Sequence, residues 1–67
     1  MIGDEIKKAR ARAKLSQEEL AFRAGVHRTY ISILERNKKS PTLDVLLRIC
    51  SALGVSPSSM VKKIESS

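Results

Sequence analysis

Residues 27–33 bring together side chains that could hydrogen-bond to a ligand or touch one from a single side of a short helix. At 3.6 residues per turn, these side chains lie on the opposite face of the helix from Ile31 and Leu34. The outward set is His27, Arg28, Thr29, Ser32 and Ile33. A guanidinium can pair with guanine O6 and N7, hydroxyls can bond to base edges, and an aliphatic side chain can contact a thymine methyl. This chemistry is that of a surface that reads the DNA major groove.

The elements that must position this surface lie in Gln17–Arg36, whose spacing is that of a helix-turn-helix. Apolar or small residues stand where two short helices must face each other: Leu20, Ala24, Val26, Ile31 and Leu34. Ala21 supplies the small side chain that a steep helix crossing requires. Gly25 can take the positive φ of the turn and end the first helix.

The charge of the chain is concentrated around this segment. The net charge is +6; residues 1–39 contain ten Lys or Arg against five Asp or Glu, and residues 40–67 contain three against two. Binding to phosphates releases condensed counterions, so the basic half favours a polyanionic partner such as double-stranded DNA. A merely solvated basic surface is the alternative.

The remaining sequence predicts three more helices and no strand, and therefore an all-α, compact five-helix bundle forming one domain over residues 1–67. The expected helices span residues 2–13, 17–24, 27 or 28 to 36, 43–53 and about 57–65. Apolar positions Ile2, Ile6, Ala9 and Ala13 define the first helix, and Leu43, Leu46, Leu47, Ile49, Cys50 and Leu53 define the fourth.

Helix boundaries are marked by capping residues. Ser16 and Glu19 form a capping-box pattern, and Thr42 is a good N-cap. Asn37 suits a left-handed helix end, Gly54 stops the fourth helix, and Pro57 follows Ser56 at a first helical position.

Several function classes are excluded by composition. One cysteine and one histidine cannot assemble a zinc site or an internal disulfide, and Cys50 falls on an apolar face where packing is expected. There is no phosphate-cradling glycine loop and no nucleophile paired with a base, so we expect no enzyme, no catalytic residue and no cofactor. Without a signal-peptide pattern or apolar span, the protein is expected to be cytoplasmic and away from the membrane. Because the chain is expected to form a single domain, no small-molecule ligand is expected either.

Five motifs in register resemble the lambda repressor and Cro (XRE-like) family of helix-turn-helix domains. They are LSQEELA at Leu15–Ala21, AG at Ala24–Gly25, YIS at Tyr30–Ser32, LER at Leu34–Arg36 and LGVS at Leu53–Ser56. The stretch AFRAGVHRTYIS at Ala21–Ser32 is also similar to the short controller proteins of restriction-modification systems, which are dimeric transcription regulators.

The resemblance implies that the third helix lies in the major groove and that the outward set His27, Arg28, Thr29, Ser32 and Ile33 contacts bases. It also implies phosphate contacts from Gln17, Tyr30, Arg36, Asn37, Lys38 and Lys39. Other interpretations stay open: Arg28 contacting only phosphate, Gln17 as a plain first-turn residue, Tyr30 as core, and a solvated loop after the third helix.

Arg10 and Glu35 match positions that pair in related repressors, where the pair ties the first helix to the third; two unrelated surface charges are the alternative. Departures from the family pattern stand at His27, where a capping side chain is usual, at Lys14 and Asn37, where glycine is frequent, and at Ile33, often polar. Phe22 falls on the outer side of the second helix or packs under the first.

These residues predict a transcription regulator that binds a palindromic operator as a homodimer, because one small domain touches too few base pairs to select a site in a genome. The expected dimer surface is Leu47, Met60, Val61 and Ile64, unless these residues close the monomer core. The alternative function is a protein-binding module, such as the antitoxin of a toxin-antitoxin pair, with Phe22 and Ile33 as anchors.

Overall fold

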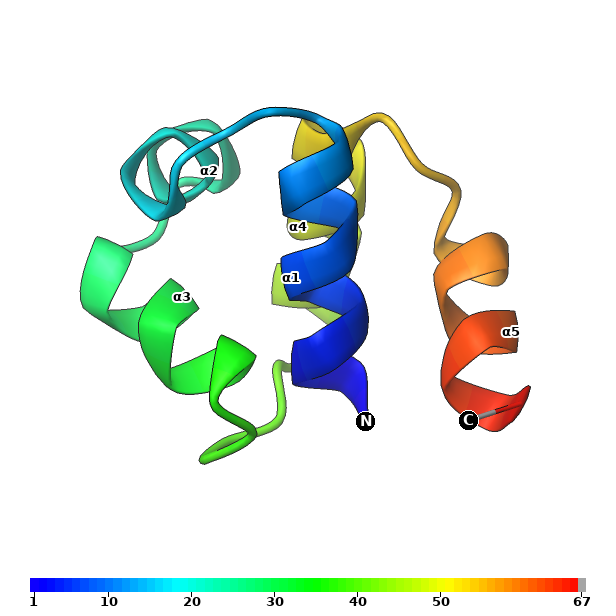
Figure 1. The fold of residues 1–67 in the computed structure, drawn as a ribbon. Helices are drawn as coiled ribbons and strands as arrows, with labels where there is room; N and C mark the ends of the chain where they lie inside the picture. Colours follow the sequence, from blue (N-terminus) through cyan, green and yellow to red (C-terminus); the bar gives the residue numbers. More distant parts are fainter. Residues whose placement is uncertain (67) are drawn as a thin grey trace.

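Five helices surround a small aliphatic core in the computed structural model, which describes residues 1–66 (Figure 1). They are α1 (Ile2–Arg12), α2 (Gln17–Ala24), α3 (Arg28–Glu35), α4 (Leu43–Leu53) and α5 (Pro57–Ser66). In Figure 1, α2 and α3 lie to one side of α1, α5 lies to the other, and α4 runs behind α1. The predicted all-α fold is confirmed, with α1 and α3 each ending one residue earlier than expected.

Capping side chains explain where α2 and α4 begin. The Ser16 hydroxyl accepts a hydrogen bond from the Glu19 N–H at 3.0 Å, and the Ser16 N–H donates to Glu19 Oε1 at 2.9 Å. Thr42 Oγ1 accepts from the Val45 N–H at 3.3 Å. The predicted capping box is therefore confirmed, whereas α3 begins after His27 without a side-chain cap.

Left-handed residues follow the ends of four helices. They are Lys14 (φ 58°), Gly25 (φ 71°), Asn37 (φ 60°) and Gly54 (φ 71°). After α3, the Asn37 N–H donates to the Leu34 carbonyl at 3.0 Å and the Lys38 N–H to the Ile33 carbonyl at 3.1 Å. This pair of bonds is a Schellman motif, which satisfies carbonyls that the helix leaves unpaired.

The core joins the first four helices through side chains without solvent exposure. These are Ile6, Leu20, Ile31, Leu34, Ile49 and Cys50. Ala21 and Ala24 are also buried, which lets α2 approach its neighbours closely. Burial raises the pKa of the Cys50 thiol, so this residue serves as neutral packing.

Three side chains predicted to lie on apolar helix faces are exposed. Ala13 lies beyond the last residue of α1, where the chain turns away from the core. On α4, Leu43 and Leu47 are exposed, with Leu47 at 44%. The buried face of α4 is therefore narrower than its sequence pattern indicates, because only one side of this helix has neighbours to pack against.

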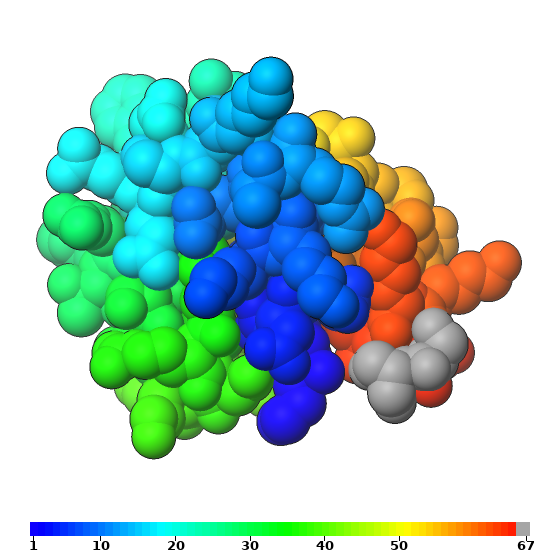
Figure 2. Space-filling model, viewed as in Figure 1, coloured from blue at the N-terminus to red at the C-terminus, as the bar shows by residue number. Residues whose placement is uncertain are grey.

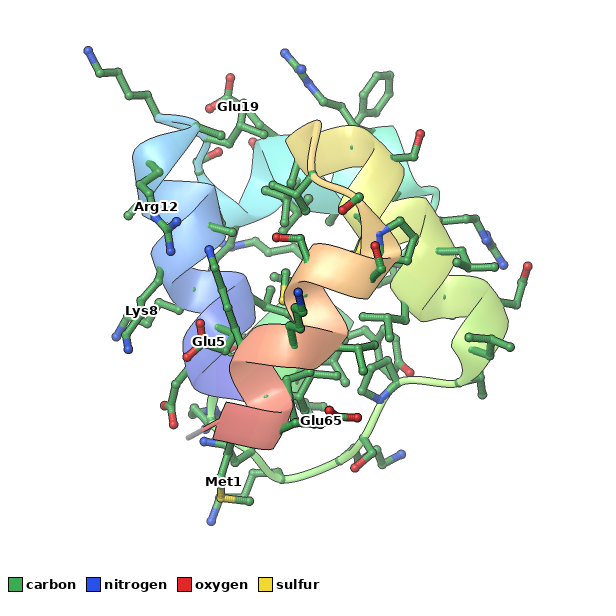
Figure 3. All side chains as sticks on the ribbon, turned by 90° about the vertical axis from the view of Figure 1, so that its right-hand side faces the viewer. Met1, Glu5, Lys8, Arg12, Glu19 and Glu65 are labelled. Carbon is green, nitrogen blue, oxygen red and sulfur yellow. The ribbon has the colours of Figure 1, made fainter. Side chains whose placement is uncertain are left out.

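The packing of α5 places part of the predicted dimer surface inside the core. It packs on α1 and α4, and Figure 3 shows it lying across the front of these two helices. Met60 is only 3% exposed and belongs to the core, and Ile64 is half-buried against that core. Leu47 and Val61 (41% exposed) remain on the surface.

Candidate nucleic-acid interface

Helix α3 has a core face and an outward face, as its periodicity predicts. Ile31 and Leu34 have no solvent exposure, whereas His27, Arg28 and Thr29 are exposed. Ser32 and Ile33, which complete the outward set, are half-buried. The exposure predicted for Ile33 is therefore only partial.

The start of α3 keeps its polar side chains free of contacts within the protein. Among residues 1–66, no hydrogen bond or ion pair involves the side chains of His27, Arg28 or Thr29. The first backbone N–H groups of the helix also lack a side-chain acceptor from His27. Donors at this end therefore remain available to a ligand, and together they favour an anionic one.

The other end of α3 is held by an ion pair to α1. Arg10 Nε donates to Glu35 Oε2 at 2.7 Å, and Arg10 Nη2 donates to Glu35 Oε1 at 3.0 Å. Arg10 Nη1 also donates to the Leu15 carbonyl at 2.9 Å. The Arg10 side chain is 17% exposed and the Glu35 side chain 3%, so the pair is largely shielded from water. The hydrogen bond to Glu35 raises the pKa of Arg10, and this geometry fixes the end of α3 against α1.

Gln17 joins the same ion pair from the start of α2. Its Nε2 donates to Glu35 Oε1 at 3.0 Å, so one carboxylate holds α1, α2 and α3 together. The role predicted for Gln17 from the sequence was a phosphate contact, and the hydrogen bond to Glu35 was not predicted. No periodicity could have revealed it, because Gln17 and Glu35 lie on different helices and eighteen residues apart.

The segment after α3 contains both free and engaged side chains. Lys38 and Lys39 are exposed and form no ion pair within the described chain. Arg36 is exposed and donates from Nε to the Ser32 carbonyl at 3.3 Å. The side chain of Asn37 instead bonds to Gly3 and Asp4, which differs from the free amide expected of a phosphate contact.

The sequence left open whether Tyr30 is a core residue or contacts phosphate, and the burial of this side chain is compatible with both interpretations. It is half-buried and packs against the core cluster.

Phe22, by contrast, is 87% exposed on the outer side of α2, so the interpretation that placed it under the first helix is wrong. Figure 2 shows α2 and α3 together forming one side of the molecule, with α5 on the opposite side.

Within 1–66, no three His, Cys, Asp or Glu side chains gather where a metal ion could be held. No helix of this part of the chain has the length and apolarity to cross a membrane. The candidate interface consists of α3, the loop after it and the start of α2.

A five-helix bundle in which a short turn joins α2 to an α3 with an exposed outer face defines a helix-turn-helix domain of the lambda repressor-like type. The chain belongs to the helix-turn-helix family, whose model matches residues 6–66. It is 39% identical over 62 residues to control protein C.BamHI of Bacillus amyloliquefaciens, covering 91% of this chain and 76% of that protein.

Solved structures give the same result. The restriction-modification controller protein C.AhdI of Aeromonas hydrophila superposes with a TM-score of 0.85 at 32% identity, covering 88% of this chain and 89% of that one. The biofilm regulator SinR, solved in complex with DNA, superposes with a TM-score of 0.86 at 37% identity, covering 91% of this chain and 98% of that one. These relatives are regulators and not enzymes, so the predicted family is confirmed.

Proposed function

We propose that this protein is a sequence-specific, DNA-binding transcription regulator with α3 as its recognition helix in the major groove. The observation that carries the proposal is the unengaged start of α3, where His27, Arg28 and Thr29 point outward from a helix anchored at its other end. The net charge of +6 and the SinR structure in complex with DNA support the same partner.

Each part of the interface has a distinct role in this proposal. Arg28 reads a guanine through a bidentate contact, Thr29 and Ser32 bond to neighbouring base edges, and Ile33 contacts a thymine methyl. Lys38 and Lys39 bind phosphates and supply affinity without sequence information. Gln17 contributes through the backbone N–H groups at the start of α2, because its side-chain N–H is bonded to Glu35.

Selection of bound sequences from random DNA at fixed salt tests the proposal. We expect a short consensus repeated as a palindrome, with half-sites about one helical turn apart. Binding without sequence preference, or an affinity that does not change with salt, would contradict it.

The palindrome follows from a proposed homodimer. Leu47 on α4 and Val61 on α5 are apolar and exposed on two helices that pack together, away from the reading surface of α3. A charged residue at either position should shift a dimer toward monomer while leaving the buried core intact. Sedimentation at micromolar concentration measures this for Leu47→Lys and Val61→Lys, with exposed Ala11→Lys on α1 as control. A wild-type protein that stays monomeric on and off DNA would rule out the dimer.

A second candidate function is protein binding, as in an antitoxin, and it is favoured by one observation. Phe22 is largely exposed and, with Glu18, Glu19 and Arg23 of the same helix, lines a shallow cleft that is open to solvent. An exposed aromatic in such a cleft can anchor a partner protein. Co-purification of a partner that is lost in Phe22→Ser, together with DNA affinity insensitive to sequence, would favour this function over the first.

A further inference from the structure

The first turn of α1 is capped by a residue that lies thirty-four positions away. Met1 precedes α1 and provides no side-chain cap. The Gly3 N–H, one of the donors that a helix start leaves unpaired, instead donates to Asn37 Oδ1 at 2.9 Å. Asn37 Nδ2 in turn donates to Asp4 Oδ1 at 3.4 Å. The amide of Asn37 therefore uses its oxygen and one of its two N–H groups on the start of α1.

Gly3 makes this contact possible because it has no side chain. A Cβ at this position would collide with the Leu34 carbonyl oxygen and with the Asn37 side chain. The backbone of α1 thus touches the end of α3 directly. Asn37 itself stands at φ 60°, a conformation that asparagine tolerates better than most residues.

The loop that follows depends on this junction. Lys38 comes directly after Asn37, and its N–H closes the Schellman motif on the Ile33 carbonyl at 3.1 Å. The side chains of Lys38 and Lys39 are exposed and form no hydrogen bond or ion pair within residues 1–66. Their position relative to α3 is therefore set by Asn37, through its backbone conformation and its two bonds to α1.

We propose that Asn37 is a positioning residue for DNA binding, which caps α1 in order to hold Lys38 and Lys39 where they meet phosphates, and does not itself contact DNA. The inference rests on the proposed function. It replaces the phosphate contact predicted for Asn37 from sequence with an indirect role. A direct contact would have to use the second Nδ2 hydrogen, which lies beside the Asp4 carboxylate, and the negative charge of that carboxylate opposes a phosphate there.

The free protein tests the junction without any DNA. Asn37→Gly keeps the positive φ but removes the amide, so we expect the Gly3 amide to exchange with solvent about tenfold faster and the melting temperature to fall. Lys14→Gly is the matched control, because Lys14 has φ 58° in the same position after α1 and its side chain is exposed without a bond. This control should keep Gly3 protection. Equal Gly3 exchange in wild type and Asn37→Gly would overturn the inference.

DNA binding then separates positioning from direct contact. If Asn37 positions the lysines, Asn37→Gly should weaken binding about three- to tenfold on all sequences and reduce the salt dependence, since charged contacts are lost. Lys38→Ala should then have a smaller effect in the Asn37→Gly background than in wild type.

A direct neutral contact would give an unchanged salt slope and additive effects, and either result would overturn the inference. Wild-type protein that does not bind DNA would instead refute the proposed function, while the exchange measurement would still report on the junction.

Discussion

The two ends of α3 differ in how completely their polar groups are used inside the protein. At the start, the side chains of His27, Arg28 and Thr29 bond to nothing among residues 1–66. At the far end, Glu35 accepts from Arg10 and Gln17, and two residues later Asn37 bonds to α1. One helix thus has an anchored end and a free end.

This difference is what a reading element requires. A side chain that must bond to a base cannot also be bonded within the fold, but the helix that carries it must be held within a fraction of an ångström. Placing the anchors at Glu35 and Asn37 meets both conditions. The anchored end should therefore govern stability, and the free end should govern sequence specificity.

The largest effect is expected from Glu35→Ala. This change removes the carboxylate that pairs with the mostly buried guanidinium of Arg10. Because the charge of Arg10 is then unpaired, the free energy of unfolding should fall by about 2 to 4 kcal/mol. Urea denaturation followed by circular dichroism measures this. The double variant Arg10→Met with Glu35→Leu serves as control and should recover much of the loss. If Glu35→Ala is as stable as wild type, the anchored end has been misassigned.

Arg28→Ala is the matching change at the free end. It should cost about 1 to 3 kcal/mol of binding on the preferred site and relax one base position. Its free energy of unfolding should stay within about 0.5 kcal/mol of wild type, because the side chain is exposed and forms no hydrogen bond or ion pair within residues 1–66. Titration of preferred and single-substituted sites measures the first effect. An equal loss on every sequence would mean that Arg28 contacts only phosphate.

Lys38→Ala tests the loop that follows the anchored end of α3, where phosphate contacts are proposed. It should weaken binding uniformly across sequences and reduce the slope of log affinity against log salt by about one, since a single phosphate contact is removed. Binding measured over a salt series checks this. A sequence-dependent loss would move Lys38 into the reading surface.

The smallest effect is expected at the start of α2, where Gln17 bonds to Glu35 at the anchored end of α3. The hydrogen bond from the Ser16 N–H, and then the Ser16 hydroxyl, lower the pKa of Glu19. A lowered pKa in the folded state adds stability above the ordinary glutamate pKa, and this stability is lost as pH falls through the lowered value. Melting temperatures across the acid range should show a slightly weaker pH dependence in Glu19→Gln than in wild type. Identical profiles would show that the capping carboxylate contributes nothing measurable.

Much of the fold was predictable because its signals are local. The capping box at Ser16 and Glu19, the left-handed residues after the helices, and the alternation of core and outward positions on α3 all act within one or two turns. The predicted helices accordingly match the structure to within a residue at most ends.

The errors arose where the outcome depends on which neighbour covers a helix. Met60 and Val61 are adjacent and both apolar, yet Met60 is buried and Val61 exposed, because α5 packs on α1 and α4 with one side only. The same reason leaves Leu43 and Leu47 exposed on α4.

The sequence by itself therefore determined the five helices, the helix-turn-helix and the outward face of α3, since these follow from backbone capping and helical periodicity. Only the tertiary structure decided that Gln17 bonds to Glu35 and that Asn37 caps α1 at Gly3. Both contacts join residues on separate elements, and their formation depends on how the packed core brings those elements together.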